Sequence, residues 1–240
     1  MTYGALVQAA DVPAERSARG ATVRNLLATG PAGPRLARRL VDVSSGSCFD
    51  GTAGAGGELW FVIAGDGRLD VEGQPGLPVT GDRALWIPPA ARYQLRADGP
   101  ADLHLDAVTL PVAGTGSGSA ESTAPLVSDL RDCAVETTGD RRFRVLFGPG
   151  RGCAVATQFA GEIPPGRAPE HSHPYDELVL ILAGEGVLHT GGGDHPIRAG
   201  SCAHLPPGLR HCIENTGPAM LRVLGVFHPA DSPAAKNGSD

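Results

Sequence analysis

The chain contains two copies of one sequence pattern, and this duplication constrains its fold more than any other feature. In each copy a glutamate precedes six apolar residues and a glycine, at residues 58–65 and again at 177–184. Farther along, residues 81–89 correspond to residues 200–207, with one added residue in the first copy. The period is about half the chain, which predicts two similar units in tandem and not a solenoid of short repeats.

The apolar runs within the two copies predict β-strands. Residues 59–64 and 178–183 are short, continuous and bounded by glycine, as expected of strands that are covered on both faces. Glycine (34) and proline (21) together make up nearly a quarter of the 240 residues, which favours short strands joined by turns. We expect little helix, with only residues 13–19 forming one or two helical turns.

The second copy carries three histidines and a glutamate whose spacing suits a metal ion. His171 and His173 are two residues apart, so on an extended strand both rings point to one face. A proline then ends that strand, and Glu177 can open the returning strand opposite the two rings. Residues 206–208, Pro-Pro-Gly, predict a turn that delivers His211. Such a set suits manganese, iron, nickel, zinc or copper, and six-coordination leaves two positions for water, dioxygen or substrate.

These stretches resemble the two signature motifs of the cupin superfamily. The first motif fits residues 166–184, except that the spacer before His-x-His is one residue shorter than usual, and the second motif fits residues 200–215 without a gap. The resemblance implies the metal ligands His171, His173, Glu177 and His211. Because the pattern occurs twice, the resemblance implies an all-β bicupin made of two tandem jelly-roll barrels, and it covers roughly residues 20–230.

The repeat pattern also divides the chain into parts. We expect an N-terminal cupin repeat, a linker rich in glycine and serine, a metal-binding cupin repeat and a flexible tail, at residues 1–112, 113–124, 125–230 and 231–240 respectively.

The first repeat is predicted to be degenerate and metal-free. Alignment of the two copies puts Thr52, Gly54 and Tyr93 where the second copy has its histidines, so that only Glu58 keeps a ligand type. We therefore expect one metal per chain. If Glu58 is buried its carboxylate needs a hydrogen-bond donor, and Tyr93 is a candidate for it.

Three further residues are candidates for work at the metal. Tyr175 lies between two predicted ligands, so it could reach the pocket or form the tip of a hairpin. Gln158 and Arg222 lie on predicted strands and could orient an organic acid beside the metal. Residues of these types are more often structural than catalytic.

Composition and charge exclude several classes of protein. The net charge of −6 and the pI near 5.7 leave no basic footprint for nucleic acid, and no apolar run is long enough to cross a bilayer. We see no secretion signal. The five cysteines are odd in number and form no Cys-x-x-Cys, which favours buried free thiols in the cytoplasm. The expected assembly is a monomer or a homodimer that binds a small-molecule substrate.

The resemblance to cupins does not choose a reaction, because that fold carries many activities. Our first hypothesis is a dioxygenase-type oxidoreductase that acts on a small organic substrate. The second is an oxygen-independent lyase, isomerase, decarboxylase or cyclase, in which the metal acts as a Lewis acid. The third is a non-enzymatic protein that binds a small ligand and holds a structural metal.

Overall fold

The fold is described from a computed structural model, which covers residues 5–17, 19–30, 33–72, 74–112 and 126–233. The predicted linker therefore lies outside the described residues, as does the predicted tail from residue 234 onward. The described part of the chain contains no α-helix and two short 3-10 helices, η1 (Ala9–Asp11) and η2 (Leu130–Asp132).

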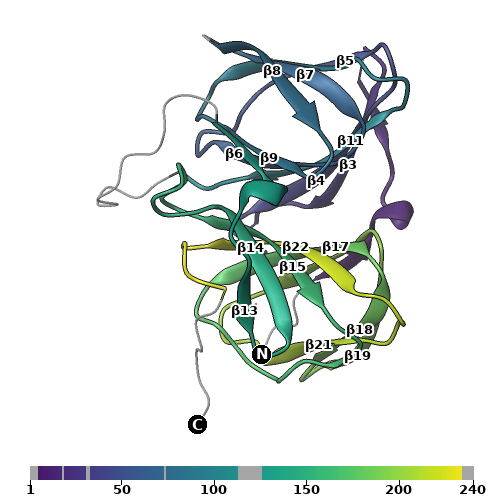
Figure 1. Ribbon diagram of the computed structural model, residues 1–240, viewed down its shortest axis with the longest axis vertical. Helices are drawn as coiled ribbons and strands as arrows, with labels where there is room; N and C mark the ends of the chain where they lie inside the picture. Colours follow the sequence, from purple (N-terminus) through teal and green to yellow (C-terminus); the bar gives the residue numbers. More distant parts are fainter. Residues whose placement is uncertain (1–4, 18, 31–32, 73, 113–125, 234–240) are drawn as a thin grey trace.

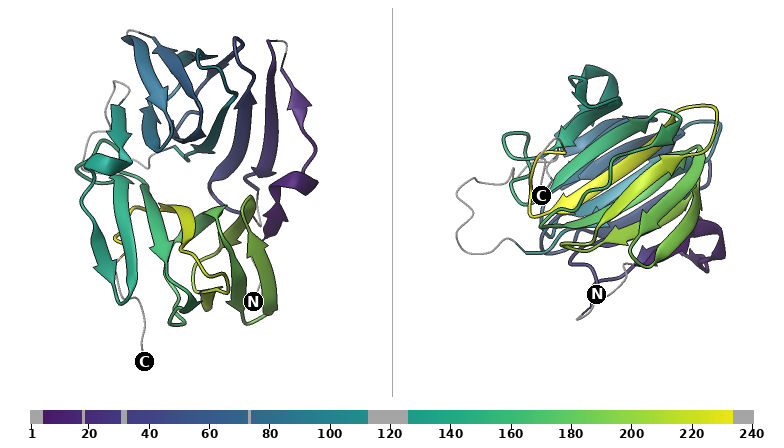
Figure 2. Two further views of the ribbon diagram at one scale, coloured as in Figure 1. Left: turned by 45° about the vertical axis from the view of Figure 1, so that its right-hand side comes forward. Right: turned by 90° about the horizontal axis from the view of Figure 1, so that it is seen from below.

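Two β-barrels are stacked along the long axis of the molecule (Figures 1 and 2), and each combines a seven-stranded with a four-stranded antiparallel sheet. This confirms the predicted all-β fold of two jelly-roll barrels. In the N-terminal barrel the large sheet has the order β12 (Leu126–Asp129), β9 (Arg83–Ile87), β6 (Glu58–Ala64), β11 (Leu103–Thr109), β4 (Ala37–Val43), β3 (Ala21–Leu27) and β2 (Glu15–Arg16). The small sheet has the order β5 (Cys48–Thr52), β10 (Arg92–Ala97), β7 (Asp66–Val71) and β8 (Gln74–Thr80).

The C-terminal barrel repeats this plan. Its large sheet has the order β1 (Leu6–Gln8), β20 (Ser201–Leu205), β17 (Asp176–Ala183), β22 (Leu221–His228), β15 (Thr157–Ile163), β14 (Arg141–Phe147) and β13 (Glu136–Thr138). Its small sheet has the order β16 (Gly166–Arg167), β21 (His211–Asn215), β18 (Glu185–Thr190) and β19 (Gly193–Arg198).

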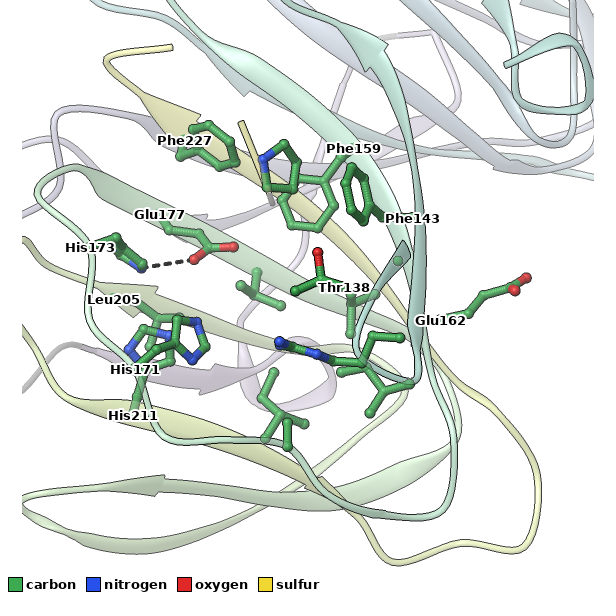
Figure 3. A pocket seen from close by; sticks show the side chains of 18 of the residues that line it. Thr138, Phe143, Phe159, Glu162, His171, His173, Glu177, Leu205, His211 and Phe227 are labelled. Atoms are coloured by element: carbon green, nitrogen blue, oxygen red, sulfur yellow. Dashed lines mark ion pairs between the residues drawn. The ribbon is translucent and has the colours of Figure 1, made fainter. Parts of the chain in front are cut away.

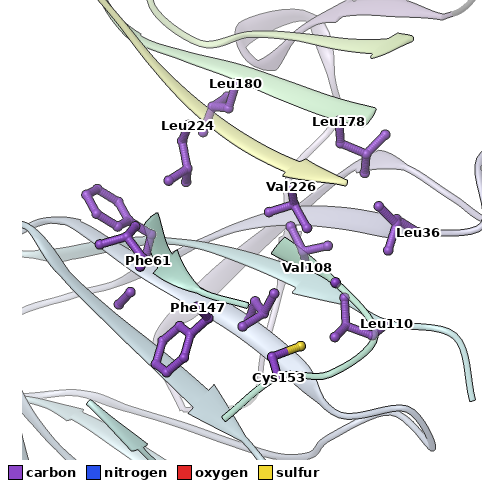
Figure 4. Close-up of a cluster of buried hydrophobic side chains, with 14 of the residues drawn as sticks. Leu36, Phe61, Val108, Leu110, Phe147, Cys153, Leu178, Leu180, Leu224 and Val226 are labelled. Atoms are coloured by element: carbon purple, nitrogen blue, oxygen red, sulfur yellow. The ribbon is translucent and has the colours of Figure 1, made fainter. Parts of the chain in front are cut away.

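The large sheets of the two barrels face each other, which explains the continuous apolar runs in the sequence. Along β17 the side chains alternate, so that Val179 and Ile181 belong to the core inside the barrel while Leu178 and Leu180 belong to the cluster shared with the other barrel. The shared cluster is shown in Figure 4 and draws on β6 and β11 of the N-terminal barrel as well. Both faces of β6 and β17 are therefore buried, as predicted.

The barrels also exchange their edge strands. Strand β1, from the start of the chain, pairs with β20 of the C-terminal barrel, and β12 pairs with β9 of the N-terminal barrel. The domain boundaries predicted from sequence assign strands to barrels by chain order, so they do not include the exchange of β1 and β12.

The expected helical turns at residues 13–19 are wrong. Strand β2 lies there and pairs with β3, with Glu15 opposite Val23. A segment this short gains little from an isolated helical nucleus, whereas pairing with an existing sheet satisfies its backbone groups at once.

Candidate metal centre

The four predicted ligands line one cavity of the C-terminal barrel (Figure 3). Glu177 is on β17, and His211 opens β21. The backbones of His171 and His211 donate hydrogen bonds to each other's carbonyl oxygens at 3.0 and 2.9 Å. His173 lies in the loop between His171 and β17, and its carbonyl accepts a hydrogen bond of 2.8 Å from the Gly208 amide of the Pro-Pro-Gly turn.

Each of the three imidazoles is fixed in the same manner. The Nδ1 atoms of His171, His173 and His211 lie 3.1, 2.8 and 2.9 Å from the carbonyl oxygens of Pro169, Tyr175 and Leu209. A carbonyl oxygen only accepts, so each Nδ1 carries the proton and each neutral ring keeps a lone pair on Nε2. Histidines that bind metals are commonly oriented by such a bond from the other ring nitrogen.

His173, Glu177 and His211 form a cluster of the right size for one ion. All three are buried, and one ligand atom from each lies within 4.8 Å of the others. His173 Nε2 is only 2.9 Å from Glu177 Oε2, but it forms no hydrogen bond. Two ligands held side by side on one ion at about 2.1 Å each are about 3.0 Å apart. The spacing therefore fits two adjacent metal ligands.

His171 lies at the border of this cluster. Its ring centroid is 4.5 Å from that of His211 but 6.4 Å from that of His173. The compact set thus contains three of the four predicted ligands. The shared Nδ1 arrangement makes His171 the candidate for the fourth, and the full ligand set stays a prediction.

The surroundings hold most of the ligand groups in the protonation state that binds a cation. Burial lowers the pKa of His211 to about 4, and burial also lowers the pKa of His171. Burial works against ionisation of Glu177, but His173 and the other two imidazoles hold the pKa of this carboxyl below its usual value. His173 differs, because the neighbouring Glu177 carboxylate outweighs burial and raises its pKa.

The ligands line a cavity of about 110 Å³. This volume suits a small ligand. Tyr175 lines the cavity, where its ring stacks on His173 with centroids 4.3 Å apart. Burial raises the pKa of the Tyr175 phenol, so the group stays protonated at neutral pH. Apolar side chains make up much of the remaining wall: Phe143, Phe159, Val179, Leu205, Ile213 and Phe227.

The other two candidates from the sequence point elsewhere. Gln158 and Arg222 are not among the residues that line the cavity, because the side chains that point inward are those of their neighbours Phe159 and Val223. Arg222 donates to Asp82 of the N-terminal barrel at 2.9 Å, and Gln158 is fully buried. We expected both side chains to face the metal, but the alternation along their strands turns them away from the cavity.

Two residues that sequence analysis missed do line the cavity. Thr138 and Arg141 come from the hairpin β13–β14, some thirty residues before the first histidine. The Thr-Gly-Asp-Arg turn was a visible hairpin signal. Nothing in the sequence connected that hairpin to the metal motif.

In the N-terminal barrel an arginine accompanies the surviving glutamate. Arg39 Nη2 is 2.7 Å from Glu58 Oε2, which also accepts from Trp60 Nε1 at 2.7 Å. Tyr93 was expected to be the donor, but the structure shows it 3.4 Å from Arg39 instead. Register pairs Tyr93 with Gly51, as His211 pairs with His171, so Gly51 and not Thr52 is the counterpart of His171. A side chain at Gly51 would collide with the Tyr93 ring.

The described residues agree with two further expectations. All five cysteines are free, and four of them are buried. None of the described helices is long and apolar enough to cross a membrane.

Comparison with known proteins agrees with this architecture. A family model described as Cupin domain matches residues 160–227. The oxalate-binding protein of Thermotoga maritima is 43% identical over 68 residues, which are 28% of this chain and 56% of that protein. Protein SchB of Streptomyces halstedii is 38% identical over 63 residues, which are 26% of this chain and 44% of that protein. These matches therefore span about half the length of the curated relatives.

Solved structures extend the likeness to both barrels. A putative glyoxylate-induced protein from Pseudomonas aeruginosa aligns with a TM-score of 0.82 at 14% identity, over 99% of this chain and 93% of that chain. A mutant of Bacillus subtilis oxalate decarboxylase aligns with a TM-score of 0.77 at 13% identity, over 97% and 79%. Identity this low shows the fold alone. Residues 160–227 therefore match the cupin domain, and the chain as a whole has the fold of a bicupin.

Proposed function

We propose that this chain is a metal-dependent enzyme that binds one divalent transition metal in its C-terminal barrel and acts there on a small organic acid. The observation that carries the proposal is the common orientation of three imidazoles around Glu177. Each Nδ1 is tied to a backbone carbonyl, and His173 Nε2 lies beside a carboxylate without a hydrogen bond. A cation that binds both His173 Nε2 and Glu177 Oε2 would account for the short distance between these two basic atoms.

The chain's own residues would then have separate roles. His173, Glu177 and His211, with His171 as the fourth, would hold the ion. The bound metal would supply Lewis acidity to a chelating substrate. The phenyl rings of the wall exclude water, which strengthens electrostatic interactions within the cavity. Tyr175 would donate a hydrogen bond to substrate, because its protonated phenol is unsuited to act as a base at neutral pH.

Oxygen-independent cleavage, as in a decarboxylase or lyase, is the reaction class we favour. The support is the fold likeness to oxalate decarboxylase, together with the similarity of the metal-motif region to the oxalate-binding protein. The dioxygenase-type reaction is the second candidate. It is favoured by the four-ligand set, which would leave positions for both dioxygen and a chelating substrate.

Metal analysis and gas measurements together test this proposal. Chelator-treated protein would be titrated with manganese, iron(II), nickel, zinc and copper(II), and we expect one tightly bound ion per chain. The loaded protein would then be offered oxalate and related small acids while carbon dioxide and dioxygen are both measured. Carbon dioxide release without dioxygen uptake supports cleavage, and matched dioxygen uptake supports the second candidate. Tight metal binding with no turnover of any acid would contradict an enzyme and favour a binding protein.

A further inference from the structure

The hairpin β13–β14 places a positive charge on the wall of the metal cavity. Thr138 and Arg141 are directly paired across the two-residue turn, in which Gly139 takes a φ of 62°. Both residues line the cavity together with the histidines. The hairpin therefore presents a hydroxyl and a guanidinium side by side.

Each of the two side chains has a buried polar atom without a hydrogen-bond partner. Thr138 Oγ1 and Arg141 Nε are both buried, and neither forms a hydrogen bond. Among the described residues no carboxylate forms an ion pair with Arg141. The neighbouring Arg142 is different, because it pairs with Glu162 at 3.3 Å, and Glu162 points away from the histidines in Figure 3.

Charge balance makes this arrangement costly unless an anion binds. Arg142 and Glu162 also line the cavity and pair with each other, so a divalent ion and the two arginines would bring four positive charges against two negative ones. Excess charge on partly buried groups is unfavourable. A ligand with two negative charges would balance the excess.

The N-terminal barrel supports a link between this arginine and the metal site. Register makes Ala21 the counterpart of Arg141, since Thr22 and Arg142 pair with Asp42 and Glu162 at matching positions of β4 and β15. The barrel that lacks the histidines thus has no cation at the position of Arg141.

We propose that Arg141 and Thr138 bind the carboxylate of a small organic dianion whose other end reaches the metal. This proposal rests on the proposed function, because it assumes a metal at the histidines. The planar guanidinium suits a carboxylate, and the hydroxyl can donate to the same group. The cavity of about 110 Å³ restricts the ligand to short dicarboxylates and similar acids.

The test compares malonate with its monoamide malonamate, which keeps one carboxylate and replaces the other by an uncharged amide. Binding to manganese-loaded protein, freed of excess metal, would be measured by calorimetry. We expect the wild type to prefer malonate at least about tenfold, since charge-assisted hydrogen bonds are the stronger kind. Arg141→Gln should lose that preference and still bind malonamate, whereas Arg141→Lys should restore part of it.

Arg144→Gln is the matched control, because Arg144 is on the same strand but does not line the cavity. It should keep the wild-type preference. Manganese affinity is measured separately for every variant and should not fall in Arg141→Gln, which removes a repelling charge. If Arg141→Gln binds manganese and still prefers malonate as the wild type does, the proposal is overturned while the metal site stands. If the wild type binds no metal, the proposed function itself fails.

Discussion

The two barrels share one glutamate position and surround it with different basic side chains. In the C-terminal barrel Glu177 is beside three imidazoles, and Phe159 lies on the inward face of β15. In the N-terminal barrel Glu58 is paired with Arg39, which register makes the counterpart of Phe159, because Arg39 pairs with Ala107 and Phe159 with Gly225. The guanidinium satisfies the buried carboxylate within the chain itself. Where the histidines are absent, the glutamate is therefore paired with a cation of the chain itself.

A second difference lies between the barrels, at the residues just before these two. Arg38 and Gln158 occupy equivalent positions, opposite Val108 and Val226, and both are fully buried. Arg38 pairs with Asp106 at 2.7 Å and donates to the carbonyl of Leu178 in the other barrel at 2.9 Å. The amide of Gln158 has no hydrogen-bond partner. Of two equivalent positions in the interface, one therefore holds a hydrogen-bonded ion pair and the other an amide without a hydrogen-bond partner.

The largest expected effect follows from this contrast. Arg38→Met would leave Asp106 charged and unpaired in the interface, and removal of one partner of a buried pair costs about 3–5 kcal/mol. Gln158→Met, the matched change, should be neutral or stabilising, because it removes polar atoms that have no partner. Guanidinium denaturation measures both free energies of unfolding. Equal losses in the two variants would show that the asymmetry has no energetic meaning.

Arg39 provides the next test of the comparison. Arg39→Met should lower the free energy of unfolding by about 3 kcal/mol, because Glu58 loses its charged partner in a buried position. The double variant Arg39→Met with Glu58→Gln should recover part of this loss, since the amide carries no charge. The measurement is again chemical denaturation, analysed as a double-mutant cycle. An additive double variant would mean that the two side chains do not interact.

Removal of an imidazole tests the other barrel. His211→Ala should weaken metal binding by more than about 100-fold, since loss of groups that merely orient ligands already costs 10–100-fold. Without metal the variant should stay folded, because apolar strands form the core. Tyr93→Phe, at the equivalent position, should leave metal affinity unchanged. Titration followed by calorimetry gives both values, and full affinity in His211→Ala would remove it from the ligand set.

Sequence predicted those features that are local or repeated. The apolar runs predicted β6 and β17, the equivalent strands of the two barrels. The spacing of the second copy predicted that its histidines lie near Glu177. The direction of side chains on β15 could not be predicted in this way, because a shift of one residue exchanges the two faces of a strand. Gln158 was expected inside the barrel for this reason, whereas Phe159 lines the cavity.

Partners distant in sequence were also beyond prediction. Arg39 meets Glu58 only because β4 and β6 both flank β11, and the exchange of β1 and β12 depends on how the barrels stack. Nothing local in the sequence specifies either contact. Tertiary packing decides contacts of this kind. It also places the hairpin that carries Arg141 at the cavity wall.

The smallest effect concerns pH, and it distinguishes a site with unequal histidines from one with three ordinary ones. The pKa of His211 is lowered to about 4 by burial, and that of His171 is lowered too, so both rings are neutral somewhat below pH 6.5 and need lose no proton to bind metal. His173 has a raised pKa because of Glu177. As pH falls through that raised value, the metal must displace one proton. Affinity should then drop about tenfold per pH unit, since one unit corresponds to about 1.4 kcal/mol per proton.

Three histidines with ordinary pKa values would instead give a thousandfold loss per unit at low pH. Metal affinity measured from pH 5 to pH 8 would give the slope directly. A slope of three protons above pH 5 would show that burial does not keep His171 and His211 neutral.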